Sequence, residues 1–134
     1  MKRQLLLLLI GAAFLILLIS VGFFMHLKRL HRSISYFQTV GEYVQEGKLD
    51  EAIVLLKDTL EKNPRLAEAH AALGIIYNKK DLHDEALSEL KMALAINPDL
   101  VGVYKEMYLV YRKKGMEDEA KKALDSYERL TGSQ

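Results

Sequence analysis

The distribution of apolar residues divides the chain into two unlike parts. Residues 5–27 are almost continuously apolar and carry no charged side chain, with polar interruptions only at Ser20 and His26. From residue 33 to residue 134, apolar residues recur every three or four positions among many charged ones, which is typical of amphipathic helices. The sequence therefore predicts an all-α protein, with one apolar helix followed by a helical module.

The apolar segment is long enough to cross a bilayer. A helix of 23 residues is roughly 35 Å long, against about 30 Å for the hydrocarbon core. A cleaved secretory signal is the alternative, because the chain starts with Met1-Lys2-Arg3 and a leucine run. However, the apolar stretch exceeds the roughly 7 to 15 residues of a signal core and does not end in a small-x-small cleavage site. A transmembrane helix over 5–27 is the favoured interpretation.

Charge is distributed unevenly along the chain. Residues 1–32 contain five Lys/Arg residues and no acid, whereas residues 33–134 contain 14 Lys/Arg against 18 Asp/Glu, a balance of 14 − 18 = −4. We therefore predict a basic tail over 1–4, a basic juxtamembrane linker over 28–32, and contact with membrane lipid through 5–32. The acidic balance of the module argues against a nucleic-acid partner.

The basic flanks give only a small preference for one membrane orientation. Three Lys/Arg residues follow the apolar segment within 28–32 and two precede it within 1–4, which favours a cytoplasmic module. A short basic start on a signal-like segment argues for the opposite side. The sequence thus predicts a single-pass protein, of a bacterial inner membrane, with the cytoplasmic side favoured and the periplasmic side open.

The boundary between the two parts contains no helix breaker. Neither Pro nor Gly occurs between Gly22 and Gly41. The apolar helix is therefore expected to continue into the first helix of the module, and a break at residues 31–33 is the alternative.

The helical module repeats with a period of 34 residues. A fixed period of this size predicts a solenoid, in which each unit buries its apolar face against its neighbours. The chain aligns with itself as three repeats, 33–66, 67–100 and 101–134. The recurring residues are Tyr43, Tyr77 and Tyr111; Asp50-Glu51-Ala52, Asp84-Glu85-Ala86 and Asp118-Glu119-Ala120; and Leu56, Leu90 and Leu124.

Each repeat is predicted to be a pair of antiparallel helices. Asn63-Pro64 and Asn97-Pro98 end second helices, because proline disfavours helical geometry in the residue before it. Gly47 and Gly115 lie between paired helices, where they can adopt left-handed backbone angles.

An acidic residue stands near the start of each second helix. Asp50, Asp84 and Asp118 are predicted to cap these helices by accepting hydrogen bonds from unpaired backbone N–H groups. The glutamate that follows each aspartate is favoured by the helix dipole. All three repeats are therefore expected to start their second helices in the same way.

The repeats resemble the tetratricopeptide repeat family, most clearly in the second repeat. That repeat carries Leu73, Gly74, Tyr77, Ala86, Leu90, Ala93 and Pro98 at the family's characteristic positions. The first and third repeats depart from the pattern, since Val40 and Tyr108 replace the small residue found at Gly74. The resemblance covers three quarters of the chain and implies a helical-hairpin solenoid with a concave surface that binds peptides or helices.

The resemblance also implies which residues line this groove. The groove is lined by residues from the first helix of each repeat. The same resemblance implies that Lys79, Glu106 and Lys113 also face the groove. An apolar floor with Asn78, Lys105 and Arg112 beside it favours a peptide or amphipathic helix as ligand. The predicted protein-binding residues are Phe37, Gly41, Val44, Ala71, Ile75, Asn78, Lys105, Leu109 and Arg112.

Family members that bind chaperone tails hold a terminal carboxylate with a set of Lys, Asn and Arg residues. The corresponding positions here are uncharged or acidic, so a chaperone tail is not expected as a ligand. These positions are Phe37, Gly41, Ala72, Gly102 and Glu106.

The sequence contains no recognisable catalytic motif. Cysteine is absent and the four histidines do not form an i, i+4 metal pair. Neither a phosphate-binding loop nor a nucleophile motif is present. We therefore expect no enzyme activity, no cofactor, no metal and no small-molecule substrate.

The predicted function follows from the anchor and the groove together. It is a membrane-anchored scaffold or adaptor that binds a protein partner and supports assembly of a membrane-associated complex. Two alternatives stay open: an assembly factor for envelope or cytochrome machinery facing the periplasm or exterior, and a small subunit that stabilises a membrane enzyme.

Overall fold

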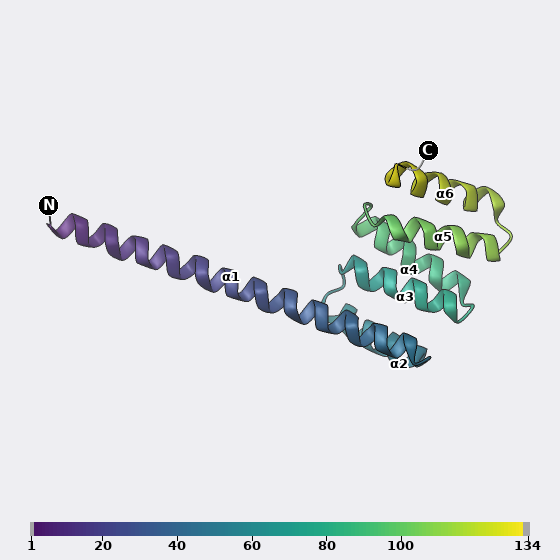
Figure 1. Ribbon diagram of the computed structural model, residues 1–134, viewed down its shortest axis with the longest axis horizontal. Coiled ribbons are helices and arrows are strands. Elements are labelled where there is room, and N and C mark those ends of the chain that lie inside the picture. Colours follow the sequence, from purple (N-terminus) through teal and green to yellow (C-terminus); the bar gives the residue numbers. More distant parts are fainter. Residues whose placement is uncertain (1, 133–134) are drawn as a thin grey trace. The chain divides into compact units, whose positions relative to one another are not determined.

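The computed structural model describes residues 2–132, which form helices joined by short turns (Figure 1). The predicted all-α class is confirmed over this range. The six helices are α1 (Lys2–Gln45), α2 (Leu49–Lys62), α3 (Ala67–Lys79), α4 (His83–Ile96), α5 (Val101–Lys113) and α6 (Glu117–Thr131). The chain divides into two compact units, Met1–Gly41 and Glu42–Gln134.

The first unit consists of α1 up to Gly41. Residues 31–33, where a break was the alternative, are helical. Within α1, Leu7–Lys28 is a stretch of 22 residues with mean hydropathy 2.8, none of it buried. By length and composition this stretch is able to cross a membrane, and a signal sequence meets the same criterion. The Ser20 hydroxyl donates to the Leu17 carbonyl at 2.8 Å, so this polar side chain is satisfied within the helix.

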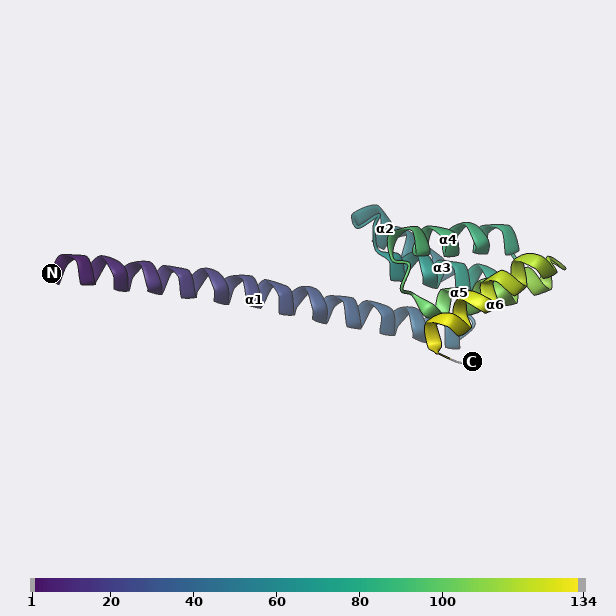
Figure 2. The ribbon, with the colours of Figure 1, turned by 90° about the horizontal axis from the view of Figure 1, so that it is seen from above.

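The second unit is a stack of helical hairpins. Helix α3 packs against α4 and α5 against α6, while α2 contacts α3 and α4 contacts α5 (Figures 1 and 2). Successive elements are therefore neighbours in space, as expected for a solenoid.

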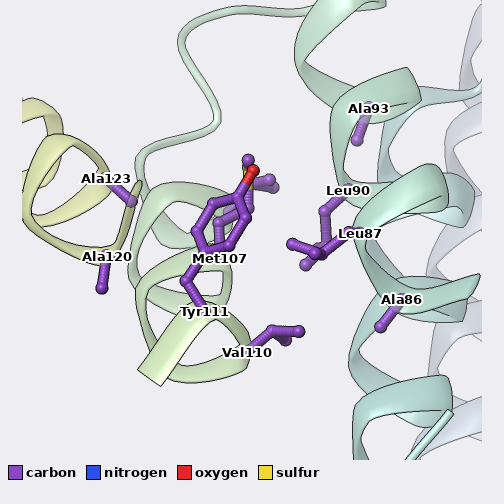
Figure 3. Close-up of a cluster of buried hydrophobic side chains, with 10 residues drawn as sticks. Ala86, Leu87, Leu90, Ala93, Met107, Val110, Tyr111, Ala120 and Ala123 are labelled. Atoms are coloured by element: carbon purple, nitrogen blue, oxygen red, sulfur yellow. The ribbon is translucent and has the colours of Figure 1, made fainter. Parts of the chain in front are cut away.

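Small residues allow these helices to approach closely. Ala86 and Ala93 of α4 and Ala120 and Ala123 of α6 are buried, with larger side chains filling the space between them. Figure 3 shows Leu87 and Leu90 of α4 facing Met107, Val110 and Tyr111 of α5, with the two alanines of α6 on the far side of α5. This cluster joins the second hairpin to the third.

The turns confirm the predicted helix breakers. Helices α2 and α4 end at Lys62 and Ile96, each immediately before an Asn-Pro pair. Gly47 and Gly115 have φ angles of +75° and +71°. At the equivalent position of the middle hairpin, Asp81 has a φ of +58°, which the sequence did not predict.

The predicted capping role of Asp50, Asp84 and Asp118 is wrong. The second helices begin earlier, at Leu49, His83 and Glu117, and no side chain caps them. The aspartates lie in the first turn, where the helix dipole favours negative charge.

Two of these aspartates instead form ion pairs between repeats. Lys80 pairs with Asp50, and Lys114 pairs with Asp84. The two pairs are equivalent residues one 34-residue period apart, so the same contact links α2 to the end of α3 and α4 to the end of α5.

Candidate functional site

A surface hollow of about 550 Å³ lies along α3 and α5, the first helices of the second and third hairpins. Residues spaced by three and four positions lie on the same face of a helix, so each helix contributes one stripe of side chains. We refer to this feature as the α3–α5 hollow. It is lined by Ile75, Asn78, Lys79, Glu106, Tyr108, Leu109, Arg112 and Lys113.

Three lining residues, Ile75, Tyr108 and Leu109, supply apolar surface, and we call them the floor of the hollow. Ile75 and Tyr108 are half-buried, and Leu109 is 40% exposed although it is a large apolar residue. Grouped apolar surface in a concavity is typical of places where a partner side chain is bound.

Charge around this floor is predominantly positive. Three cations, Lys79, Arg112 and Lys113, are opposed by one carboxylate, Glu106, a balance of 3 − 1 = +2. The hollow therefore differs in sign from the module as a whole, which carries more acids than bases. An anionic group is favoured here by charge complementarity.

Arg112 is held by Tyr108, one turn before it on α5. Its Nη1 donates to the Tyr108 hydroxyl at 3.0 Å, and the guanidinium carbon lies 5.8 Å from the ring centroid. The hydrogen bond to Tyr108 raises the pKa of Arg112 above its usual value, so the guanidinium stays charged. This bond uses one of the five guanidinium N–H donors. The others meet no acceptor among the residues that the structure describes.

Lys113 is tied to the preceding hairpin. Its Nζ donates to Asn78 Oδ1 at 3.2 Å and to the Asn78 carbonyl oxygen at 3.4 Å. It also lies 3.4 Å from Asp81 Oδ1. Asn78 is only 7% exposed, so its side-chain oxygen is committed to Lys113.

The structure brings four of the nine predicted groove residues together. Ile75, Asn78, Leu109 and Arg112 line the hollow. Ala71 instead packs against the buried cluster of the second and third hairpins.

The other four predicted residues lie outside this lining. Lys105 is exposed on α5, and Val44 is half-buried in the last turn of α1. Phe37 and Gly41 are half-buried in the first unit, where the Phe37 ring contacts the edge of Tyr36 at a centroid distance of 5.2 Å.

Tyr108 is a lining residue of the α3–α5 hollow that the sequence prediction missed. It occupies the position of Gly74 in the family pattern, which predicts a residue packed between paired helices. In the structure it lines the hollow and holds Arg112. A tyrosine one turn before an arginine is the signal that would have identified it.

A second hollow of about 510 Å³ has the opposite character. It is lined by Tyr43, Asp50, Glu51, Val54, Leu55 and Asp58, so its rim is acidic. Its acid Asp50 is paired with Lys80. No grouping of three or more metal-ligating side chains occurs within residues 2–132 as described.

Comparisons with known proteins agree with this architecture. Residues 43–108 match the family model described as "Tetratricopeptide repeat". No curated protein matches the sequence significantly. Among solved structures, the crystal structure of MamA is 25% identical with a TM-score of 0.68, over 72% of this chain and 57% of that chain.

Two further structures extend the comparison. A MamA D159K mutant is 30% identical with a TM-score of 0.61, over 66% of this chain and 51% of that chain. The first TPR of Spaghetti (RPAP3), bound to the HSP90 peptide SRMEEVD, is 20% identical with a TM-score of 0.70, over 75% and 80% of the two chains. The chain thus spans little more than half the length of these MamA structures. Together the matches establish a tetratricopeptide-repeat fold.

Proposed function

We propose that this tetratricopeptide-repeat module is a membrane-anchored scaffold, which binds a protein partner in the α3–α5 hollow and supports assembly of a membrane-associated complex. The observation that carries the proposal is the combination of an apolar floor with a guanidinium whose donors are largely free. Ile75 and Leu109 provide the first and Arg112 the second.

The chemistry of the hollow favours a peptide segment with one apolar and one acidic side chain. An apolar side chain on Ile75 and Leu109 removes both from water, and arginine binds a carboxylate through two parallel N–H donors. Desolvated apolar and arginine contacts are the ones that dominate protein interfaces. A volume of about 550 Å³ is sufficient for a few side chains.

A chaperone tail is not the ligand that we propose. The RPAP3 structure contains an HSP90 peptide, but at 20% identity that similarity supports the fold alone. At the positions where family members hold a terminal carboxylate, this chain has Ala72, Gly102 and Glu106, which supply no positive charge. The cations of the α3–α5 hollow stand elsewhere on α3 and α5.

The anchor supports a role at a membrane. None of the 22 residues Leu7–Lys28 is buried against other parts of the chain, so their apolar surface is available to lipid. Lys28 and the basic residues that follow suit an anionic headgroup layer. Tethering raises the effective concentration of the hollow for other membrane proteins.

Site-directed photocrosslinking in native membranes tests the proposal. A photoreactive residue at Lys105, which is exposed on α5 outside the hollow, should capture a discrete partner, and the same residue at Met92 on α4 should not. Ile75→Glu should abolish capture at Lys105, because it places a carboxylate on the apolar floor. Met92→Glu is the matched control, since Met92 is 50% exposed and remote from the lining. Capture that survives Ile75→Glu contradicts the proposal.

The same chain allows a direct test of membrane orientation. It contains no cysteine, so Ser88→Cys on the exposed surface of α4 would be its single thiol. For the proposed cytoplasmic side, a membrane-impermeant maleimide should label this thiol only after the cells are lysed. Labelling in intact cells or spheroplasts would instead place the module on the periplasmic or exterior side, which the assembly-factor alternative requires.

A further inference from the structure

Asp81 holds a backbone conformation that glycine adopts more readily. Among the residues that the structure describes, Asp81 is the one non-glycine residue with a positive φ angle, which is +58°. The equivalent residues of the neighbouring hairpins are Gly47 and Gly115, with φ of +75° and +71°. Side chains with a Cβ are strained in this region, and aspartate and asparagine tolerate it better than other residues do. The position raises the question of what the Asp81 side chain contributes.

The carboxylate of Asp81 reaches across to the next hairpin. Its Oδ1 lies 3.4 Å from Lys113 Nζ at the end of α5. The Nε2 of His83 is 3.9 Å from the same oxygen, beyond hydrogen-bond distance. A glycine in this turn would relieve the backbone strain but would leave Lys113 without this acceptor.

Asn78 is the second unusual residue in contact with Lys113. It is the buried polar residue among the described side chains, and the equivalent positions in the other repeats are Val44 and Arg112. Its side-chain and backbone oxygens lie 3.2 and 3.4 Å from Lys113 Nζ. With Asp81 they supply three acceptors, which equals the number of N–H donors on a lysine ammonium.

We propose that Asn78 and Asp81 are positioning residues, which fix the Lys113 ammonium at the edge of the α3–α5 hollow as a preorganised positive charge. The inference rests on the proposed binding function of that hollow. Fixing a long side chain before binding lowers the conformational entropy that the complex must lose. Asp81 offsets part of the Lys113 charge, so Lys113 contributes a fixed and partly offset positive charge, while Arg112 supplies the donors for the carboxylate of the partner.

The alternative is that these contacts only strengthen the packing of α3 on α5. Both roles require the same hydrogen bonds, so stability measurements alone do not separate them. They differ in two respects: the freedom of the Lys113 amine in the unbound protein, and the effect of releasing it on partner binding.

The first experiment measures the freedom of Lys113 without a partner. The full chain in detergent is treated with limiting acetic acid N-hydroxysuccinimide ester, and acetylation is read at each lysine by mass spectrometry. Asp81→Asn should raise the rate at Lys113 about two- to fivefold, the range of a partly exposed ion pair. Lys122, exposed on α6, is the internal reference and should not change.

Asp81→Gly provides a second variant that also removes the strain. It should release Lys113 as Asp81→Asn does, with a thermal unfolding midpoint no lower than that of the unmodified chain. Circular dichroism checks that both variants retain their helices. An unchanged rate at Lys113 in both folded variants would overturn the positioning role.

The second experiment links the release of Lys113 to binding. Asp81→Asn should reduce photocapture of the partner at Lys105 about two- to fivefold, even though it also removes a negative charge beside the hollow. A gain in capture would show that net charge, and not the fixed position of Lys113, determines binding, and would overturn the inference. If Lys113 is released but capture is unchanged, the contacts serve only packing and the inference is wrong. If the unmodified chain captures no partner at all, the proposed function is wrong. The acetylation rate of Lys113 is measured without a partner, so that result would still test whether Asn78 and Asp81 hold Lys113 in place.

Discussion

Gly74 of α3 lies against the side chain of Leu90 of α4, with no room between them for another carbon atom. A Cβ added to Gly74 would be 2.6 Å from Leu90 Cγ, 2.7 Å from Leu90 Cδ2 and 3.1 Å from the Ala86 carbonyl oxygen. Leu90 is fully buried, and side chains in a close-packed interior have little free volume into which to move. The close approach of the two helices in the second hairpin therefore depends on a glycine at this position.

Gly74→Ala is expected to destabilise the module by about 1 to 3 kcal/mol, the usual cost of overpacking a close contact. Thermal unfolding of the full chain in detergent, followed by circular dichroism, measures the change. Gly102→Ala is the matched control, because a Cβ there meets nothing within 4 Å. Since alanine favours helix more than glycine does, the control should be neutral or gain up to about 1 kcal/mol. Equal effects of the two substitutions would contradict this account of the hairpin.

The sequence predicted this hairpin because its information is local and periodic. Gly74, Ala86 and Leu90 stand at positions of the family pattern, and the two Asn-Pro pairs lie on either side of this hairpin, within a few residues of its ends. The hollow was less predictable. The tie between Lys113 and Asn78 joins residues 35 positions apart, and it depends on how α5 lies over α3. A 34-residue period gives the order of helices but not the directions of side chains between them.

Gly115→Ala tests the left-handed turn of the third hairpin. Its φ of +71° is a region in which a Cβ is strained, although the surrounding space is open. The substitution should therefore cost about 1 to 2 kcal/mol from backbone strain alone. The thermal midpoint of the full chain should fall, and that of Gly102→Ala should not. A neutral Gly115→Ala would show that this turn relaxes to negative φ without cost.

The ion pair between Lys114 and Asp84 predicts a dependence of stability on pH. The hydrogen bond from Lys114, and then its charge, lower the pKa of Asp84 below that of an unfolded chain. Because the pKa of Asp84 is lower in the folded chain, the ion pair adds to the free energy of unfolding at pH values above the unfolded pKa of about 3.9. This contribution is lost as pH falls through the folded pKa. The effect should be small, since the Asp84 side chain is 84% exposed and solvent screens the pair.

When the pH is lowered from about 6 to about 3, the thermal unfolding midpoint should drop less in the Asp84→Asn variant than in the unmodified chain. Asp125→Asn is the control, since Asp125 is exposed and forms none of the described ion pairs. About 1 M salt should reduce the difference between Asp84→Asn and the unmodified chain at neutral pH. If both substitutions change the acid response equally, the pair with Lys114 does not contribute to stability.

The prediction that Asp84 caps a helix shows why the two ion pairs between repeats, Lys80 with Asp50 and Lys114 with Asp84, were not predicted. An aspartate before an apolar-periodic stretch is typical of a helix cap, and all three repeats contain one. The helices begin at Leu49 and His83 instead, so the carboxylates of Asp50 and Asp84 lie in the first turn. Lys80 and Lys114 are themselves 34 residues apart, and this shared period was the available sign of a contact between repeats.

A charged substitution in the apolar part of α1 tests the membrane anchor. Leu15 lies near the centre of Leu7–Lys28 and is 59% exposed, so replacing it disturbs no core. An arginine at the centre of a spanning helix costs about 2.5 to 3.5 kcal/mol on insertion scales. Leu15→Arg combined with Leu18→Arg should therefore release the chain from membranes in carbonate extraction. The conservative pair Leu15→Ile and Leu18→Ile should stay in the membrane pellet.

The mass of the membrane-bound chain separates an anchor from a cleaved signal. An uncleaved anchor predicts the full 15.3 kDa in the pellet, whereas signal cleavage removes the apolar stretch and yields a shorter chain in the soluble fraction. In the second case the module acts without a tether, and photocapture at Lys105 should still depend on Ile75. Because the lining of the hollow, among the described residues, comes from α3 and α5, the ligand chemistry that we propose there does not involve α1. Loss of the anchor would thus alter where the scaffold acts while leaving its ligand unchanged.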